Sequence, residues 1–177
     1  MLCHSSKVYK FVVDGSPLKY KVIFVAKGYS QVQGIDYNDT FAPVAKMDSI
    51  RLSLAIAALK HWEVYHMNVK CAFVNGDLNG EIYMQKLEGF VSNPYLVCRL
   101  KKSLYGLKQA PRAWYAKIDR FLLSLSFVQC KSDPNVYLKL IHGYLIIIFL
   151  YVDDLLITGS SKKEIASLKD AMTMHFL

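Results

Sequence analysis

The strongest constraint on the fold is a nine-residue apolar run, residues 144–152, which leads directly into Asp153 and Asp154. A helix that crosses a bilayer needs about 20 apolar residues, so this run is too short to span a membrane. It is rich in β-branched and aromatic side chains and follows Gly143, which is typical of a buried strand. The run therefore predicts a core strand with two carboxylates at its end, and no membrane partner.

Two adjacent carboxylates after a hydrophobic strand indicate metal chemistry. Ionised groups are costly in such places unless they are solvated, paired or bound to a metal. Mg²⁺ prefers oxygen ligands, and two such ions can activate an attacking oxygen and stabilise a leaving oxygen in phosphoryl transfer. For an isolated Asp-Asp pair, a solvated turn is the simpler interpretation, and only the surrounding sequence favours a metal site over it.

Composition supplies part of that context. The chain of 177 residues has 22 Lys and Arg against 14 Asp and Glu, a formal net charge of +8. Such an excess favours an anionic partner: nucleic acid, nucleotide phosphates or an acidic membrane surface. The four cysteines are scattered without a C-x-x-C pair, which argues against a zinc ribbon or a redox motif and favours reduced thiols in an intracellular protein.

Hydrophobic periodicity predicts the other elements. Strands are expected over residues 7–13, 19–26, 62–69, 81–85, 135–141 and 155–158, and helices over residues 49–60 and 111–125 and from 162 onward. Asp48 or Ser49 can cap the first helix, Pro111 suits the first turn of the second, and Ser161 with Glu164 forms a capping box for the third. Helices interleaved with hairpins predict an α+β layered structure rather than a doubly wound parallel sheet.

Seven strings along the chain carry a family resemblance. They are, in order, residues 25–31 (VAKGYSQ), 34–37 (GIDY), 40–45 (TFAPVA), 69–78 (VKCAFVNGDL), 81–85 (EIYMQ), 101–115 (KKSLYGLKQAPRAWY) and 151–154 (YVDD). In these strings and in their order, the chain resembles the reverse transcriptase (RNA-dependent DNA polymerase) domain of copia-type retrotransposon polyproteins. The resemblance covers about residues 8–177.

The resemblance implies a polymerase fold of fingers and palm, in which the palm is a ferredoxin-like βαββαβ sheet. The fingers would take up about residues 1–62 and 76–112, and the palm about residues 63–75 and 113–177. On this basis we expect a single partial domain that lacks the last palm strand and the thumb. The RNase H and integrase regions of the family polyprotein are absent from this sequence.

The resemblance also implies templated DNA synthesis with two Mg²⁺ ions, an RNA or DNA primer–template and deoxynucleoside triphosphates. Asp153, Asp154 and the backbone carbonyl of Val69 would bind metal. Four residues match the nucleotide pocket: Phe73, which crowds a ribose 2′-hydroxyl, and Tyr105, Gly106 and Lys27. Four basic residues are expected to contact nucleic acid: Lys101, Lys102, Lys108 and Arg112. The family implies an intracellular location, in the cytoplasm or nucleus.

Each of these residues also has a plain structural interpretation. Phe73 alone would be read as a core aromatic, Tyr105 and Gly106 as a turn, and the basic side chains as solvated charges. The family match is what favours the functional interpretation.

The chain departs from the family at its third catalytic carboxylate. The family typically reads Met-Asp-Val-Lys where this chain has Asn68 between Met67 and Val69, and Ile23 stands where the family has a phosphate-binding arginine. Asparagine offers a neutral oxygen where two divalent ions need negative charge, so we predict a degenerate copy with activity lowered on the order of 10³-fold or more. The alternative is a catalytically silent, nucleic-acid-binding remnant of the polyprotein.

Overall fold

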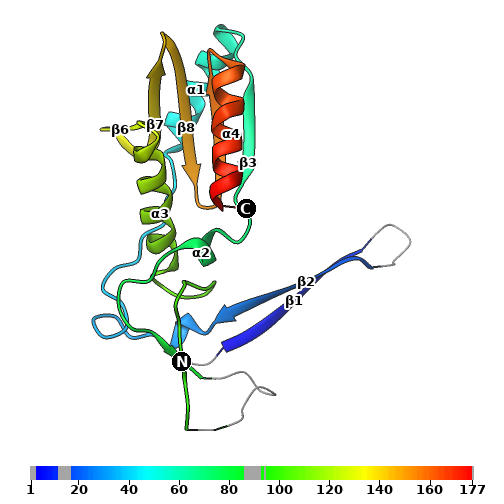
Figure 1. Cartoon of the computed structure of the whole chain (residues 1–177), viewed down its shortest axis with the longest axis vertical. Helices are drawn as coiled ribbons and strands as arrows, with labels where there is room; N and C mark the ends of the chain where they lie inside the picture. The colour runs from blue at the N-terminus through cyan, green and yellow to red at the C-terminus, as the bar shows by residue number, and fades with distance from the viewer. Residues whose placement is uncertain (1–2, 12–16, 86–92, 94, 177) are drawn as a thin grey trace.

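The computed structural model describes residues 3–11, 17–85, 93 and 95–176. An antiparallel hairpin of β1 (Cys3–Phe11) and β2 (Pro17–Ala26) begins the chain and projects sideways from the rest of the molecule (Figure 1). Both predicted strands are present, although β1 begins at Cys3, earlier than predicted, and residues 12 and 13 of the predicted first strand, like the predicted turn at residues 14 and 15, lie outside the described residues.

A five-stranded antiparallel sheet forms the centre of the structure, with the strand order β3-β9-β8-β7-β6. Its strands are β3 (Val64–Asn68), β6 (Val128–Cys130), β7 (Asp133–Ile141), β8 (Tyr144–Tyr151) and β9 (Asp154–Gly159). The apolar run is β8, near the middle of the sheet, as its composition predicts. The sheet and its helices confirm the α+β class.

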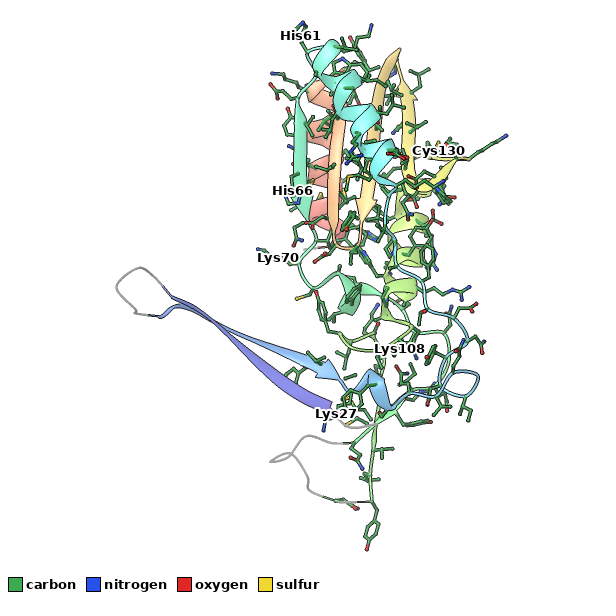
Figure 2. The ribbon with its side chains drawn as sticks, turned by 180° about the vertical axis from the view of Figure 1, so that it is seen from behind. Lys27, His61, His66, Lys70, Lys108 and Cys130 are labelled. Atoms are coloured by element: carbon green, nitrogen blue, oxygen red, sulfur yellow. The ribbon has the colours of Figure 1, made fainter. Side chains whose placement is uncertain are left out.

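Helices cover both faces of this sheet (Figures 1 and 2). On one face, α3 (Ala110–Ser124) and α4 (Lys162–Phe176) bury the main core, to which Trp114, Ile118 and Leu122 contribute fully buried side chains. On the other face, α1 (Met47–Leu59) packs through Ile50 against a smaller cluster. Alternate residues of β8 enter the two clusters, because successive side chains of a strand point to opposite faces.

A smaller region adjoins the end of the sheet that carries the β8–β9 turn (Figure 1). It contains η1 (Gly28–Ser30), α2 (Ala72–Asn75) and a two-stranded ladder of β4 (Tyr83–Met84) and β5 (Cys98–Arg99). Ala26, Leu107 and Ala110 are its buried core. No helix in the described part of the chain is long and apolar enough to cross a membrane.

Two predicted boundaries were wrong. Neither Asp48 nor Ser49 caps α1, which begins at Met47 after an extended Lys46. The backbone N–H of Lys46 donates instead to the carboxylate of Asp133, at 2.8 Å, and no local pattern reveals a partner 87 residues away. The strand expected over residues 81–85 is reduced to Tyr83–Met84, because its ladder with β5 holds only two residue pairs.

Candidate active site

The turn between β8 and β9 consists of Val152 and Asp153, with Asp154 as the first residue of β9, and it is held from three sides. The N–H of Val152 donates to the carbonyl of Pro43 at 2.6 Å, and the indole N–H of Trp114 donates to the carbonyl of Val152 at 2.7 Å. The N–H of Val69 donates to the carbonyl of Asp153 at 2.8 Å. These contacts from α3, the segment before α1 and the end of β3 fix the turn even though Val152 adopts a left-handed φ of 59°.

Asp154 lies opposite Asn68 in the β3–β9 ladder. The amide Nδ2 of Asn68 donates to Asp154 Oδ1 at 2.9 Å, and His66 Nε2 contacts the same oxygen at 2.9 Å. His66 and Asn68 share a face of β3 because they are two residues apart. The site therefore joins one carboxylate, one amide and one imidazole at the edge of the sheet, where Figure 2 places His66.

Asp153 belongs to a different environment, near Tyr105. The rings of Phe73 and Tyr105 meet edge to face, with centroids 4.9 Å apart. Burial raises the pKa of the Tyr105 phenol, and the nearby Cys71 and Asp153 raise it further. The structure thus brings together Phe73 and Tyr105, two of the predicted pocket residues, and places Tyr105 close enough to Asp153 for the carboxylate charge to act on its phenol.

Gly106 lies where the end of β2, next to Lys27 in the sequence, approaches the loop after residue 104. The N–H of Ala26 donates to the carbonyl of Tyr105 at 2.7 Å. Gly106 has a φ of +88°, and a Cβ on it would lie 2.1 Å from the carbonyl oxygen of Ala26. The backbones are so close that only glycine fits, and Lys27 is half-buried at this junction.

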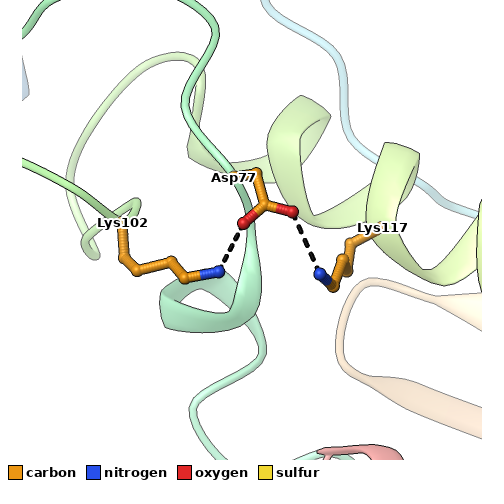
Figure 3. Close-up of polar contacts among 3 residues, drawn as sticks. All are labelled: Asp77, Lys102 and Lys117. Carbon is orange, nitrogen blue, oxygen red and sulfur yellow. Dashed lines mark hydrogen bonds and ion pairs between the residues drawn. The ribbon is translucent and has the colours of Figure 1, made fainter.

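The predicted nucleic-acid contacts divide into two pairs. Lys102 forms an ion pair with Asp77, whose other oxygen accepts from Lys117 at 3.0 Å (Figure 3), and Arg112 lies 3.5 Å from Asp39. Hydrogen bonds from Lys102 and Lys117 lower the pKa of Asp77. Lys101 and Lys108 are exposed, and no carboxylate among the described residues pairs with either of them.

The side chains around Asp154 do not match the set of carboxylates that two Mg²⁺ ions require. Asn68 directs its N–H₂ group at Asp154, and an N–H donor cannot coordinate a cation. Within the described ranges there is no group of three or more His, Cys, Asp or Glu side chains that could hold a metal ion. The metal roles expected for Asp153, Asp154 and the Val69 carbonyl remain predictions.

Sequence reasoning missed the residues that position the turn. Pro43 and Trp114 act through a backbone carbonyl and an indole N–H, from positions 109 and 38 residues away from Val152, and nothing local indicates either contact. His66 lies within the strand predicted over residues 62–69, on the same face as Asn68. Its contact with Asp154 depends on the register between β3 and β9, which the sequence does not contain.

A mixed α+β fold with an Asp-Asp turn in its antiparallel sheet is consistent with a reverse transcriptase domain. The chain belongs to the reverse transcriptase (RNA-dependent DNA polymerase) family, whose model matches residues 4–177. The resemblance found in the sequence is thereby confirmed.

Relatives from plants and yeast agree with this assignment. The chain is 47% identical over 174 residues to the "Retrovirus-related Pol polyprotein from transposon TNT 1-94" of Nicotiana tabacum, covering 96% of this chain and 13% of that protein. It is 43% identical over 169 residues to the polyprotein from transposon RE2 of Arabidopsis thaliana, covering 94% and 12%. It is 28% identical over 160 residues to the "Transposon Ty1-H Gag-Pol polyprotein" of Saccharomyces cerevisiae, covering 85% and 8%. No solved structure matches the chain.

Proposed function

We propose that this chain is a part of a retrotransposon reverse transcriptase that retains a surface for primer–template but is a weak or inactive polymerase. The observation that carries the proposal is the hydrogen bond from Asn68 Nδ2 to Asp154 Oδ1, 2.9 Å long, at the position where the family places a third carboxylate. The five-stranded sheet with α3 and α4 would be the palm, over about residues 63–75 and 113–177. Residues 1–62 and 76–112 would be the fingers.

The loss at Asn68 acts through charge. In the family, two divalent ions activate the primer hydroxyl and stabilise the leaving oxygen, and each carboxylate offsets part of their charge. Asn68 contributes no negative charge, and its amide N–H₂ group occupies one oxygen of Asp154. We therefore expect nucleotidyl transfer on the order of 10³-fold slower or worse, because metal stabilisation is worth several kcal/mol.

The nucleotide pocket would survive this loss. Phe73 packs edge to face on Tyr105, which orients the ring that would crowd a ribose 2′-hydroxyl. Gly106 keeps the loop against Ala26, and Lys27 lies at the same junction. These residues would bind and select a deoxynucleotide whether or not the chemical step follows.

The basic surface favours a second candidate, a catalytically silent nucleic-acid-binding remnant. Lys101 and Lys108 are exposed and have no acidic partner in the described part of the chain, so they are available for phosphates. Lys102 and Arg112 would each exchange a carboxylate for a phosphate on binding. Their contribution to affinity should therefore be smaller than that of Lys101 and Lys108.

Primer extension with Mg²⁺ and duplex binding, measured on the same protein, test the proposal. We expect salt-dependent binding of an RNA–DNA primer–template without measurable incorporation. Asn68→Asp should raise incorporation, whereas Asn79→Asp, the same change at an exposed loop position, should not. Robust extension by the unchanged chain would contradict the loss of activity. Binding without any incorporation by Asn68→Asp would favour the silent remnant.

A further inference from the structure

We propose that His66 and Asn68 together cap Asp154 in place of a cation, so that His66 is a second and independent barrier to metal binding. The proposal rests on the proposed function in one respect, namely that Asp154 is a metal-binding carboxylate. It concerns His66, a residue that the family match does not single out, and it predicts that restoring the aspartate at position 68 recovers metal binding only in part.

The two donors converge on a single oxygen. His66 Nε2 and Asn68 Nδ2 each lie 2.9 Å from Asp154 Oδ1. An ionised carboxylate oxygen accepts about two hydrogen bonds, so this oxygen has no lone pair left for a cation. A metal ion must displace both donors to use Oδ1, or bind through Oδ2 alone, and either requirement weakens binding at this carboxylate.

The imidazole does not need a positive charge to act as a cap. Nε2–H donates in the doubly protonated ring and also in the neutral ring when the proton is on Nε2. An ionised carboxylate has no proton to donate, so the contact favours a form of His66 that carries a proton on Nε2 and donates it to Asp154. The cap is therefore a matter of hydrogen bonding and geometry.

Replacing Asn68 leaves the second donor in place. An aspartate at position 68 would remove one N–H donor and set a like charge opposite Asp154 in the ladder. His66 would still contact Asp154 from the same face of β3. The side chains of His66 and Asp154 are 61% and 39% exposed, so an ion from solvent can reach them and compete without unfolding of the sheet.

Four variants of the full chain separate the two barriers. Two are the single variants Asn68→Asp and His66→Val. The other two combine Asn68→Asp with either His66→Val or His66→Gln. Valine suits an exposed strand and offers no donor, whereas glutamine keeps an N–H donor of similar reach. Mn²⁺ binding without nucleic acid is followed by the loss of the free-ion EPR signal. Circular dichroism checks that each variant is folded.

We expect the Asn68→Asp, His66→Val double variant to bind Mn²⁺ about tenfold more tightly than Asn68→Asp alone, since hydrogen bonds to charged groups are of that size. The double variant with His66→Gln should resemble Asn68→Asp, and His66→Val alone should bind weakly, as the unchanged chain does. If Asn68→Asp binds as tightly as the valine double variant, the role of His66 is refuted while the metal site stands. If no variant binds Mn²⁺, Asp154 is not a metal ligand and the premise taken from the proposed function fails as well.

Discussion

Replacing Gly28 with alanine should separate the end of β2 from the loop that carries Tyr105. A Cβ on Gly28 would lie 1.8 Å from the carbonyl oxygen of Gly106, and real Cβ atoms essentially never approach closer than 3.0 Å. The obstacle is backbone rather than the end of a flexible side chain, so the two segments must move apart. That movement breaks the hydrogen bond of 2.7 Å from Ala26 N–H to the Tyr105 carbonyl.

The expected cost follows from comparing three glycines. Forcing a side chain into packed space costs about 1–3 kcal/mol, and the broken hydrogen bond adds about 1 kcal/mol, which gives about 2–4 kcal/mol for Gly28→Ala. Gly106→Ala meets a similar clash and also pays about 1–2 kcal/mol for its φ of +88°. Gly143 has a φ of +81° with nothing within 4 Å of its Cβ position, so Gly143→Ala should cost only the conformational part.

Urea unfolding followed by circular dichroism gives the free energy of unfolding for the three variants. The expected order of destabilisation is Gly106→Ala, then Gly28→Ala, then Gly143→Ala. Faster hydrogen exchange at the Ala26 amide in Gly28→Ala would locate the damage at the junction. If Gly28→Ala cost no more than Gly143→Ala, the close approach of the two backbones would not contribute to stability and the reasoning would fail.

Three further substitutions test other contacts by urea unfolding. Trp114→Phe removes the indole donor to the Val152 carbonyl from a fully buried position, and we expect a loss of about 2–3 kcal/mol. The two carboxylate oxygens of Asp133 accept hydrogen bonds from the backbone N–H groups of Lys46 and Asn135. Asp133→Asn replaces one of these oxygens with an N–H₂ group, which cannot accept, and should cost about 1–3 kcal/mol. Asp77→Asn should cost about 0.5–1 kcal/mol at pH 7, because solvent screens this half-exposed site. Since the lysine partners lower the pKa of Asp77, its contribution is complete above about pH 4 and is lost as the pH falls through the lowered value. The wild-type and Asp77→Asn stabilities should therefore converge in acid.

The elements predicted correctly are those whose signal is local. β7, β8 and β9 follow from apolar runs separated by a two-residue turn and by the Asp-Asp pair, and α3 follows from Pro111 and its apolar stripe. α4 follows from its capping box, in which the Glu164 N–H donates to Ser161 Oγ at 3.4 Å. In each case neighbouring residues supply both the start signal and the periodicity.

The elements predicted poorly depend on partners far away in the sequence. The start of α1 is fixed by a carboxylate on β7, and the Asp-Asp turn is fixed by Pro43 and Trp114. Propensity and periodicity describe one segment at a time, so they cannot report which backbone group a distant side chain satisfies. The motif could be located in the sequence, and the structure places it at a turn of the central sheet, but the residues that support this turn could not be predicted.

Asn68 belongs to both groups. Its identity can be read directly from the sequence, whereas its contact with Asp154 depends on a strand far away in the sequence. In the sequence it is predicted to replace a carboxylate of the family. In the structure it faces Asp154 across the β3–β9 ladder, where two ionised carboxylates would repel each other unless a cation lay between them. The amide replaces that repulsion with a hydrogen bond of 2.9 Å, so the sheet edge is stable without a bound ion. An asparagine at position 68 is therefore compatible with this fold, as the proposed nucleic-acid-binding domain without polymerase activity requires.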